Sequence, residues 1–342
     1  MNRKKGVFVL GIFILLAGAA AALFFQAKSR EEEKSCEKQL FAMDTYMEFT
    51  AYGKKCEQAV DAAIEKVQSL DALLSAQDEK SEIYALNQAG SLEVSGDTAA
   101  LLARAQEIYE DTDRLFDITI YPVMELWGFP TGAYHVPTQE ELEEVLPLVD
   151  ASKVRLGETV TLSPGQKVDL GGIAKGYTSA AVMEIFREYG ISSGMVSLGG
   201  NIQALGAKPD GTAWNIGIRD PMGGQNDYFA ILSVKDKAVV TSGGYERYFQ
   251  EDGETYIHII DPRTGRPAAG DLLSVTVISQ DGTLADALST SLFIMGREEA
   301  CGYWQEHKKE FDMVLVTDEE EIYVTEGIQE DFRSEEDWTV VK

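Results

Sequence analysis

Residues 168–177, Val168-Asp169-Leu170-Gly171-Gly172-Ile173-Ala174-Lys175-Gly176-Tyr177, contain the turn on which the fold assignment depends. We predict a short strand over 168–170 that ends at two glycines, and then a helix over 173–189 that Gly190 stops. A glycine turn lets backbone amides approach a phosphate, and the helix amino end with Lys175 adds positive potential. The run could therefore hold a pyrophosphate. It is neither a Walker loop nor a GxGxxG fingerprint, and such turns taken alone are more often structural.

Strand and helix patterns alternate on both sides of this turn, without a detectable repeat. Further strands are predicted at 38–52, 195–198, 214–218, 238–241, 256–260 and 273–278, and further helices at 56–74 and 98–111. The turn sequences 209–211 and 252–253 separate successive strands, which favours antiparallel pairing in part of the sheet. The sequence predicts a mixed α/β fold with one catalytic domain over residues 38–342.

Composition excludes some classes of protein. The chain has 342 residues, 44% of them hydrophobic, which is ample for a large core. Its 57 acidic and 30 basic residues give a formal charge of -27, so nucleic acid is an unfavourable partner. Cys36, Cys56 and Cys301 have no CxxC or zinc-finger spacing.

The amino end predicts a membrane segment. Arg3, Lys4 and Lys5 precede an uncharged run over 6–25, which as a helix would span roughly 30 Å. We assign residues 1–28 to an anchor and 29–37 to a linker, although the small residues 19–22 leave cleavage of a signal peptide open. The basic residues place the amino terminus inside, and the rest of the chain at the membrane surface outside the cytoplasm.

A second group of residues, 283–290, places Asp286 and Thr290 four positions apart. On a helix both side chains face the same side. A carboxylate with a hydroxyl suits Mg²⁺, which takes few protein ligands and completes its shell with phosphate and water. From the spacing alone, a solvated Asp near a helix start explains the pattern better.

Two more groups carry chemistry less specifically. His258 stands in a predicted strand that leads into an Asp-Pro turn, where it could act as a base or contact phosphate, although such a histidine is usually structural. Residues 115–119 and 125–130 are aromatic and apolar, which suits a bound ring and suits core packing equally well.

In their order along the chain and in their residues, these groups together resemble the ApbE family of FAD:protein FMN transferases, from about Phe41 to the carboxyl end. The motifs that carry the resemblance are Met43-Asp44-Thr45, Ser81-Glu82-Ile83 with Asn87, Phe116-Asp117-Ile118-Thr119, Trp127-Gly128-Phe129, Asp169 to Tyr177, Gly199-Gly200-Asn201, Thr241-Ser242-Gly243, His258 to Pro267, and Ala285-Asp286-Ala287-Leu288 with Thr290. The resemblance implies an ApbE-like catalytic domain, related to the T-fold.

The resemblance also implies site residues. The positions that match the family's FAD contacts are Met43, Leu115, Phe116, Asp117, Asp169, Lys175 and Ile257. Asp286, Thr290 and the backbone carbonyl of Gly172 match its Mg²⁺ ligands, and His258 and Asp286 are the candidate catalytic residues. Gln77 stands where many relatives have a tyrosine that contacts the flavin, and Gly244 replaces a frequent Asp.

The implied reaction is Mg²⁺-dependent transfer of FMN from FAD to a Thr or Ser hydroxyl of an exported or membrane flavoprotein, with release of AMP. Two alternatives stay open from the sequence. The same groups could hydrolyse FAD to FMN and AMP, or the protein could bind flavin without catalysis.

Overall fold

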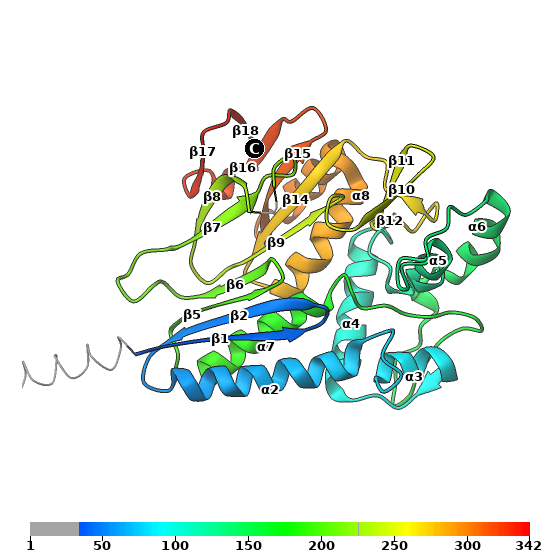
Figure 1. Ribbon diagram of the computed structural model, residues 1–342, viewed down its shortest axis with the longest axis horizontal. Helices are drawn as coiled ribbons and strands as arrows, with labels where there is room; N and C mark the ends of the chain where they lie inside the picture. Colours follow the sequence, from blue (N-terminus) through cyan, green and yellow to red (C-terminus); the bar gives the residue numbers. More distant parts are fainter. Residues whose placement is uncertain (1–33, 225) are drawn as a thin grey trace, which may run out of the picture.

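The centre of the molecule is a nine-stranded sheet, seen in a computed structural model that describes residues 34–224 and 226–342. Its strands are β1 (Ser35–Ala42), β2 (Thr45–Tyr52), β5 (Ser193–Leu198), β6 (Asn201–Leu205), β9 (Ala238–Gly243), β14 (Leu272–Ser279), β15 (Phe311–Thr317), β16 (Ile322–Thr325) and β18 (Trp338–Val341). They lie in the order β1-β2-β5-β6-β9-β14-β15-β16-β18 (Figure 1). Neighbours pair antiparallel except β16 and β18, which are parallel.

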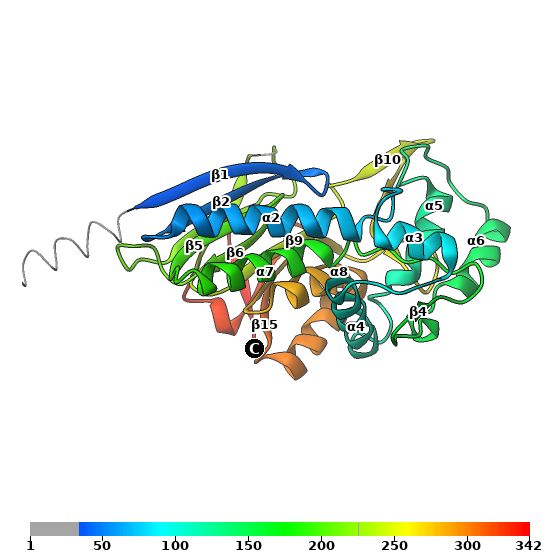
Figure 2. The ribbon, with the colours of Figure 1, turned by 90° about the horizontal axis from the view of Figure 1, so that it is seen from below.

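Three helices cover one face of this sheet: α2 (Cys56–Leu74), α7 (Ala174–Glu188) and α8 (Gly282–His307). Figure 2 shows α2 and α7 side by side beneath β1, β2 and β5. In α2, Val60, Val67 and Leu70 recur at helical spacing and are fully buried. Helix α8 packs on β9 and β14 and also against α7. The amino ends of α7 and α8 therefore meet beside the sheet.

A second, smaller sheet covers part of the other face. Its strands, in the order β17-β8-β7, are β7 (Trp214–Arg219), β8 (Tyr228–Val234) and β17 (Phe332–Ser334). Alternate residues Trp214, Ile216 and Ile218 of β7 are buried against Val239 and Val314 of the large sheet. The period-two pattern of a half-buried strand thus determines this layer.

The remaining elements lie mainly at the end of the molecule opposite the start of β1 (Figure 1). They are α3 (Glu82–Ala89), β3 (Ser91–Leu92), α4 (Gly96–Asp111), η1 (Ile118–Ile120), α5 (Tyr121–Trp127), α6 (Gln139–Val145), η2 (Leu146–Leu148), η3 (Ala151–Lys153), β4 (Val160–Thr161), β10 (Tyr248–Glu251), β11 (Glu254–Ile257), β12 (Ile260–Asp261), β13 (Arg266–Pro267) and η4 (Glu326–Ile328). Trp127 and Phe129 are fully buried in an aromatic cluster here with Phe249. This cluster supports one side of the site described below.

The predicted mixed α/β fold and its antiparallel pairing are confirmed, and helix 56–74 has the predicted bounds. The predicted single strand over 38–52 is wrong, because the segment is the β1–β2 hairpin. Met43 and Asp44 have φ of 48° and 56° and form its two-residue turn, with Ala42 paired to Thr45. Positive φ at both turn residues is the hairpin geometry that matches strand twist.

Two other predicted strands differ for non-local reasons. Residues 168–170 form no ladder, because both backbone groups of Val168 bond to the side-chain amide of Asn87, at 2.7 and 2.8 Å. The predicted strand 256–260 is split into β11 and β12. His258 lies between them and its N–H donates to the carbonyl of Arg247 instead of extending a ladder.

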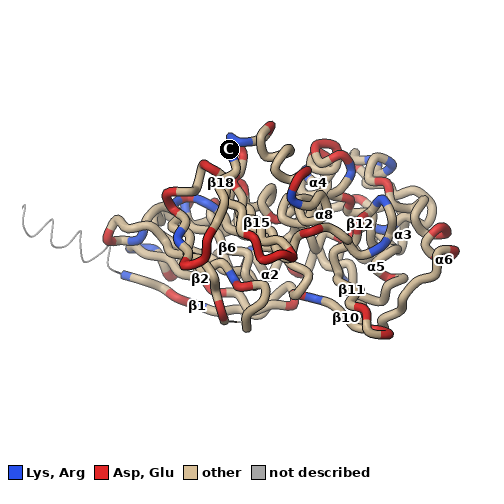
Figure 3. Tube along the Cα trace, turned by 90° about the horizontal axis from the view of Figure 1, so that it is seen from above, with Lys and Arg blue, Asp and Glu red and all other residues tan. Residues whose placement is uncertain are grey.

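The predicted anchor, residues 1–28, lies outside the described residues. In the described ranges, no helix has the length and apolar content needed to cross a membrane. Strand β1 begins at Ser35, inside the predicted linker and before the predicted start of the domain at 38. Acidic residues outnumber basic ones along the whole described trace (Figure 3).

Candidate active site

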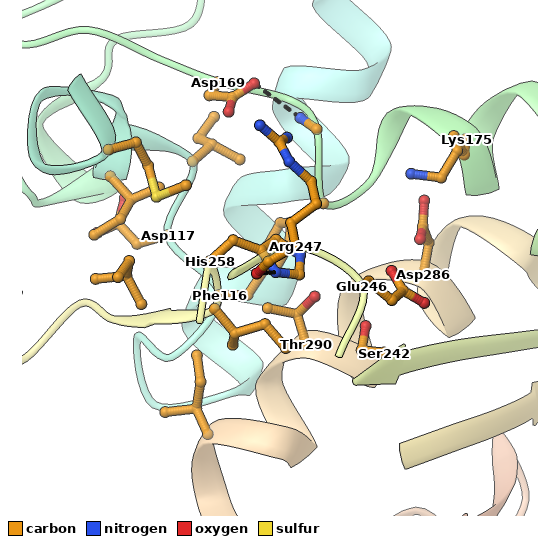
Figure 4. Close-up of a pocket in the computed structure, with 18 of the residues that line it drawn as sticks. Phe116, Asp117, Asp169, Lys175, Ser242, Glu246, Arg247, His258, Asp286 and Thr290 are labelled. Carbon is orange, nitrogen blue, oxygen red and sulfur yellow. Dashed lines mark hydrogen bonds between the residues drawn. The ribbon is translucent and has the colours of Figure 1, made fainter. Parts of the chain in front are cut away.

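A cavity of about 280 Å³ lies between the amino ends of α7 and α8, the carboxyl end of the central strand β9, and residues 115–124 and 258–262. Predicted site residues that line it are Leu115, Phe116, Asp117, Asp169, Gly172, Lys175, His258, Asp286 and Thr290. Residues from all four sequence groups that carried chemistry, separated by up to 175 positions between Leu115 and Thr290, thus meet in one cavity (Figure 4).

Hydrogen bonds fix the start of the glycine turn in residues 168–177. Asp169 donates its N–H to the carbonyl of Ile118 at 2.8 Å, and its Oδ1 accepts the N–H of Gly171 at 3.0 Å. Burial raises the pKa of Asp169, while the Gly171 N–H and the charges of Arg247 and Lys175 act to lower it. The turn therefore has an acidic group on one side and two cations facing it.

Asp286 is brought to this turn by a close helix crossing. A Cβ on Gly176 of α7 would come 2.2 Å from the carbonyl oxygen of Gly282 in α8 and 2.6 Å from the Cβ of Asp286. Only glycine permits this approach, and the Gly176 N–H then donates to Asp286 Oδ2 at 2.7 Å. Asp286 is 6% exposed, and burial raises its pKa against the nearby Lys175 charge and the Gly176 N–H. It is buried, not the solvated helix-start residue that spacing alone favoured.

The oxygen donors in this corner of the cavity fit a hard divalent cation. Asp286 and Thr290 lie on the same helix, one turn apart, and both line the cavity. Asp286 Oδ2 accepts the Gly176 N–H, and the neighbouring Asn201 side chain also acts to lower the pKa of this carboxylate. A Cβ on Gly172 would lie 4.0 Å from Thr290 Oγ1, so the glycine turn approaches the same hydroxyl. Among the described residues, no group of three or more His, Cys, Asp or Glu side chains is placed to hold a metal ion.

His258 has a defined proton-accepting nitrogen. Its Nδ1 lies 3.0 Å from the carbonyl oxygen of Arg247, which can only accept, so Nδ1 carries the hydrogen and Nε2 has the free lone pair. Burial, together with the charges of Arg247 and Lys175, lowers the pKa of His258 to about 4, although the hydrogen bond to the Arg247 carbonyl acts to raise it. The imidazole is therefore neutral at pH 7. An anion arriving in the cavity would raise its pKa and strengthen it as a base.

Residues 115–118 form the apolar wall opposite the sheet. Leu115 and Phe116 are almost completely buried. The Asp117 carboxylate is used within the fold, because Oδ1 accepts from the N–H and hydroxyl of Thr119 and Oδ2 accepts from the N–H of Ala151. Burial raises the pKa of Asp117 in spite of these bonds. The Asp117 side chain therefore shapes the wall and has little capacity left for a ligand.

A second cavity, of about 720 Å³, adjoins the first. Asp169, Gly171, Lys175 and Arg247 line both, so the two cavities share a wall at the glycine turn. Met43, predicted from the family resemblance, lines the second cavity at the tip of the β1–β2 hairpin, as does Gln77. An elongated ligand could occupy both cavities across the shared wall.

Three residues that line the first cavity were not predicted as site residues, and one predicted site residue lines neither cavity. Glu246, Arg247 and Asn201 line the first cavity, and of these only Asn201 belongs to a motif that carried the family resemblance. Figure 4 shows Arg247 turned toward Asp169, and Glu246 beside Asp286. The signal that could have found them is their position: Asn201 directly follows Gly199 and Gly200, and Glu246 and Arg247 stand shortly after the end of β9 at Gly243. Ile257, by contrast, is not among the described residues that line either cavity, and it packs on the core near Gly244.

Sequence comparison matches residues 43–315 to the model of the ApbE family. A protein named FAD:protein FMN transferase from Treponema pallidum is 33% identical over 343 aligned residues, which cover 93% of each chain. One of the same name from Vibrio cholerae is 34% identical, covering 79% of this chain and 82% of its own.

Structure comparison agrees with this result. The crystal structure of the ApbE protein from Thermotoga maritima matches with a TM-score of 0.82 and 33% identity, over 88% of this chain and all of that one. The flavin transferase ApbE from Vibrio cholerae matches with a TM-score of 0.77 over 87% of this chain. The mixed α/β fold, the cavity and both comparisons lead to one conclusion: this chain belongs to the ApbE family.

Proposed function

We propose that this protein is an FAD:protein FMN transferase that moves FMN from FAD to a Thr or Ser hydroxyl of another protein. The observation that carries the proposal is the meeting of Asp286 and Thr290 on α8 with Asp169 and Lys175 of the glycine turn in one cavity. A cationic turn beside hard oxygen donors suits a metal-bound pyrophosphate. The relatives with the same fold bear the name of this activity.

The residues supply two functions in this reaction, binding of charge and acceptance of a proton. Lys175 and Arg247 face the cavity and bind the negative charge of the pyrophosphate. His258 Nε2 accepts the proton of the entering hydroxyl. The hydroxyl oxygen forms a bond to the FMN-side phosphorus, the bond from that phosphorus to the bridging oxygen breaks, and AMP leaves with that oxygen.

Mg²⁺ is the proposed metal. Asp286, Thr290 and the Gly172 carbonyl would hold it, and when bound it would neutralise charge that develops on the pyrophosphate. Burial raises the pKa of Asp286, and the chain acts against that shift to favour the ionised carboxylate that a metal needs. The Lys175 charge and the Gly176 N–H, which both lower the pKa of Asp286, serve this purpose.

The acceptor and location are part of the same proposal. A segment over 6–25 that anchors the protein would place the catalytic domain outside the cytoplasm, where exported and membrane-bound flavoproteins are the accessible acceptors. FAD must then also be supplied on that side.

The defining experiment is incubation of the protein with FAD, Mg²⁺ and a candidate exported acceptor, followed by mass spectrometry. The acceptor should gain the mass of one FMN phosphoester on a Thr or Ser, with an equal amount of AMP. Changing that acceptor residue to Ala should stop labelling, because no oxygen remains to attack.

A control without acceptor separates transfer from hydrolysis. If FAD is cleaved equally fast without acceptor, and no protein-bound flavin survives denaturation, water is the true acceptor and the protein is an FAD pyrophosphatase.

A further inference from the structure

Asn201 is the described residue whose side chain is least explained by the fold. It begins β6 immediately after Gly199 and Gly200, which have φ of 62° and 94°. It is 2% exposed and lines the first cavity. Neither Nδ2 nor Oδ1 has a hydrogen-bond partner among the described residues. A fully buried amide with both halves unpaired is rare, because each unpaired group loses its hydration without compensation.

The position of Asn201 is fixed by its neighbours. Asn201 pairs with Leu198 across the β5–β6 hairpin, and Ile202 pairs with Val239 of β9 on the other side. The turn before it is pressed against β2, because a Cβ on Gly199 would lie 2.2 Å from the Thr45 hydroxyl. The backbone therefore cannot easily carry the amide out toward water.

The surroundings of the amide indicate which ligand would satisfy it. The amide lies near enough to Asp286 to act against burial in lowering the pKa of that group, yet no hydrogen bond of ordinary geometry joins the two side chains. Lys175 and Ser242 line the same cavity. An amide NH₂ beside Lys175 and Asp286 is placed to donate a hydrogen bond to an anionic oxygen.

We propose that Asn201 is a substrate-binding residue, whose Nδ2 donates a hydrogen bond to a non-bridging oxygen of the FAD pyrophosphate beside Asp286. This inference rests on the proposed function, since it requires a pyrophosphate in this cavity. It accounts for an amide that weakens the ligand-free fold and is satisfied on binding, as is common where a protein sacrifices stability for function.

The test is Asn201→Leu, which keeps a similar size and removes both polar halves. Without Mg²⁺, the affinity for FAD, followed by flavin fluorescence, should fall roughly 10-fold to 100-fold, as expected for a lost hydrogen bond to a charged group. The melting temperature of the FAD-free variant should equal or exceed that of the wild type, because an unpaired buried amide has been removed. The upward shift of melting temperature that FAD causes should shrink.

Two further variants sharpen the result. Asn201→Asp keeps the shape but places a negative charge beside the pyrophosphate, so it should bind FAD more weakly than Asn201→Leu. Ser193→Ala is the matched control. Ser193 is also buried with an unpaired hydroxyl, on adjacent strand β5, but it is not among the residues that line either cavity. Its removal should leave FAD affinity unchanged.

The inference is overturned if Asn201→Leu binds FAD within twofold of the wild type, or if only the KM for the acceptor protein changes. It is also overturned if the FAD-free variant melts lower while the FAD-induced shift is retained, because the amide would then serve the fold. These results would leave the proposed function standing. Failure of the wild-type protein to bind FAD would instead remove the proposed function itself.

Discussion

At the scale of single residues, burial shifts the acids and the histidine of the cavity in opposite directions. It raises the pKa of Asp169, Glu246 and Asp286 and lowers that of His258 to about 4. Glu246 keeps an exposed surface while it lines the cavity. Burial disfavours every charged form, so this pocket favours neutral groups until an anion and a cation arrive together. These pKa shifts therefore favour the binding of a metal together with a polyphosphate.

The depressed pKa of His258 predicts acid sensitivity of the fold. Between about pH 6.5 and pH 4 the unfolded chain binds a proton at this residue that the folded chain does not, so stability falls as pH falls through this range. Above pH 6.5 the effect is absent. Chemical unfolding of the wild type and of His258→Gln at pH 7 and pH 5 should show the larger loss at pH 5 in the wild type. Equal losses would mean that His258 titrates normally.

Asp286→Asn separates the metal from the fold. The amide oxygen can still accept the Gly176 N–H, while the charge that a metal needs is lost. We expect transfer to fall by at least about 100-fold with Mg²⁺ and the melting temperature to stay at or above the wild-type value. Glu298→Gln, on the exposed side of the same helix, should leave both unchanged. Wild-type transfer by Asp286→Asn would exclude this carboxylate as a ligand.

At the scale of elements, the sequence correctly predicted helices whose formation depends on local residue patterns. Helix α2 has its predicted bounds because its apolar residues recur at helical spacing. The strand predicted at Val168 is absent because the hydrogen bonds of this segment go to Asn87, which is 81 positions away. The hairpin turn at Met43 and Asp44 has no glycine to indicate it. The site residues came mostly from the family resemblance, since spacing alone could not show that α7 and α8 meet.

The meeting of α7 and α8 depends on a single missing side chain. Gly176→Ala places a Cβ within 2.2 Å of the Gly282 carbonyl oxygen, so the helices must separate. Overpacking of this kind costs about 1–3 kcal/mol. It also moves Asp286 from the glycine turn, so transfer should fall with stability. Gly302→Ala in α8 is the control, because no atom lies within 4 Å of its added Cβ, and it should stabilise by about 0.5–1 kcal/mol. Unfolding free energies and transfer rates of both variants provide the measurement.

At the scale of the whole molecule, the formal charge of -27 and the chemistry of the site oppose one another. Acidic surface repels a free dinucleotide at long range, while Lys175 and Arg247 attract its pyrophosphate within the cavity. Both cations line the wall between the two cavities. Salt should therefore weaken the long-range repulsion more than the short-range attraction within the cavity.

Cysteine labelling can test which side of the membrane the catalytic domain faces. If residues 6–25 anchor the chain with its amino end inside, the domain that begins at Ser35 faces outward. In a background with Cys36, Cys56 and Cys301 changed to Ala, Glu319→Cys on an exposed turn should react with a membrane-impermeant maleimide in intact cells. Asn2→Cys should react only after permeabilisation, because it would lie on the cytoplasmic side. The reverse pattern would place the catalytic domain inside, where exported acceptors could not reach the cavity around Asp286.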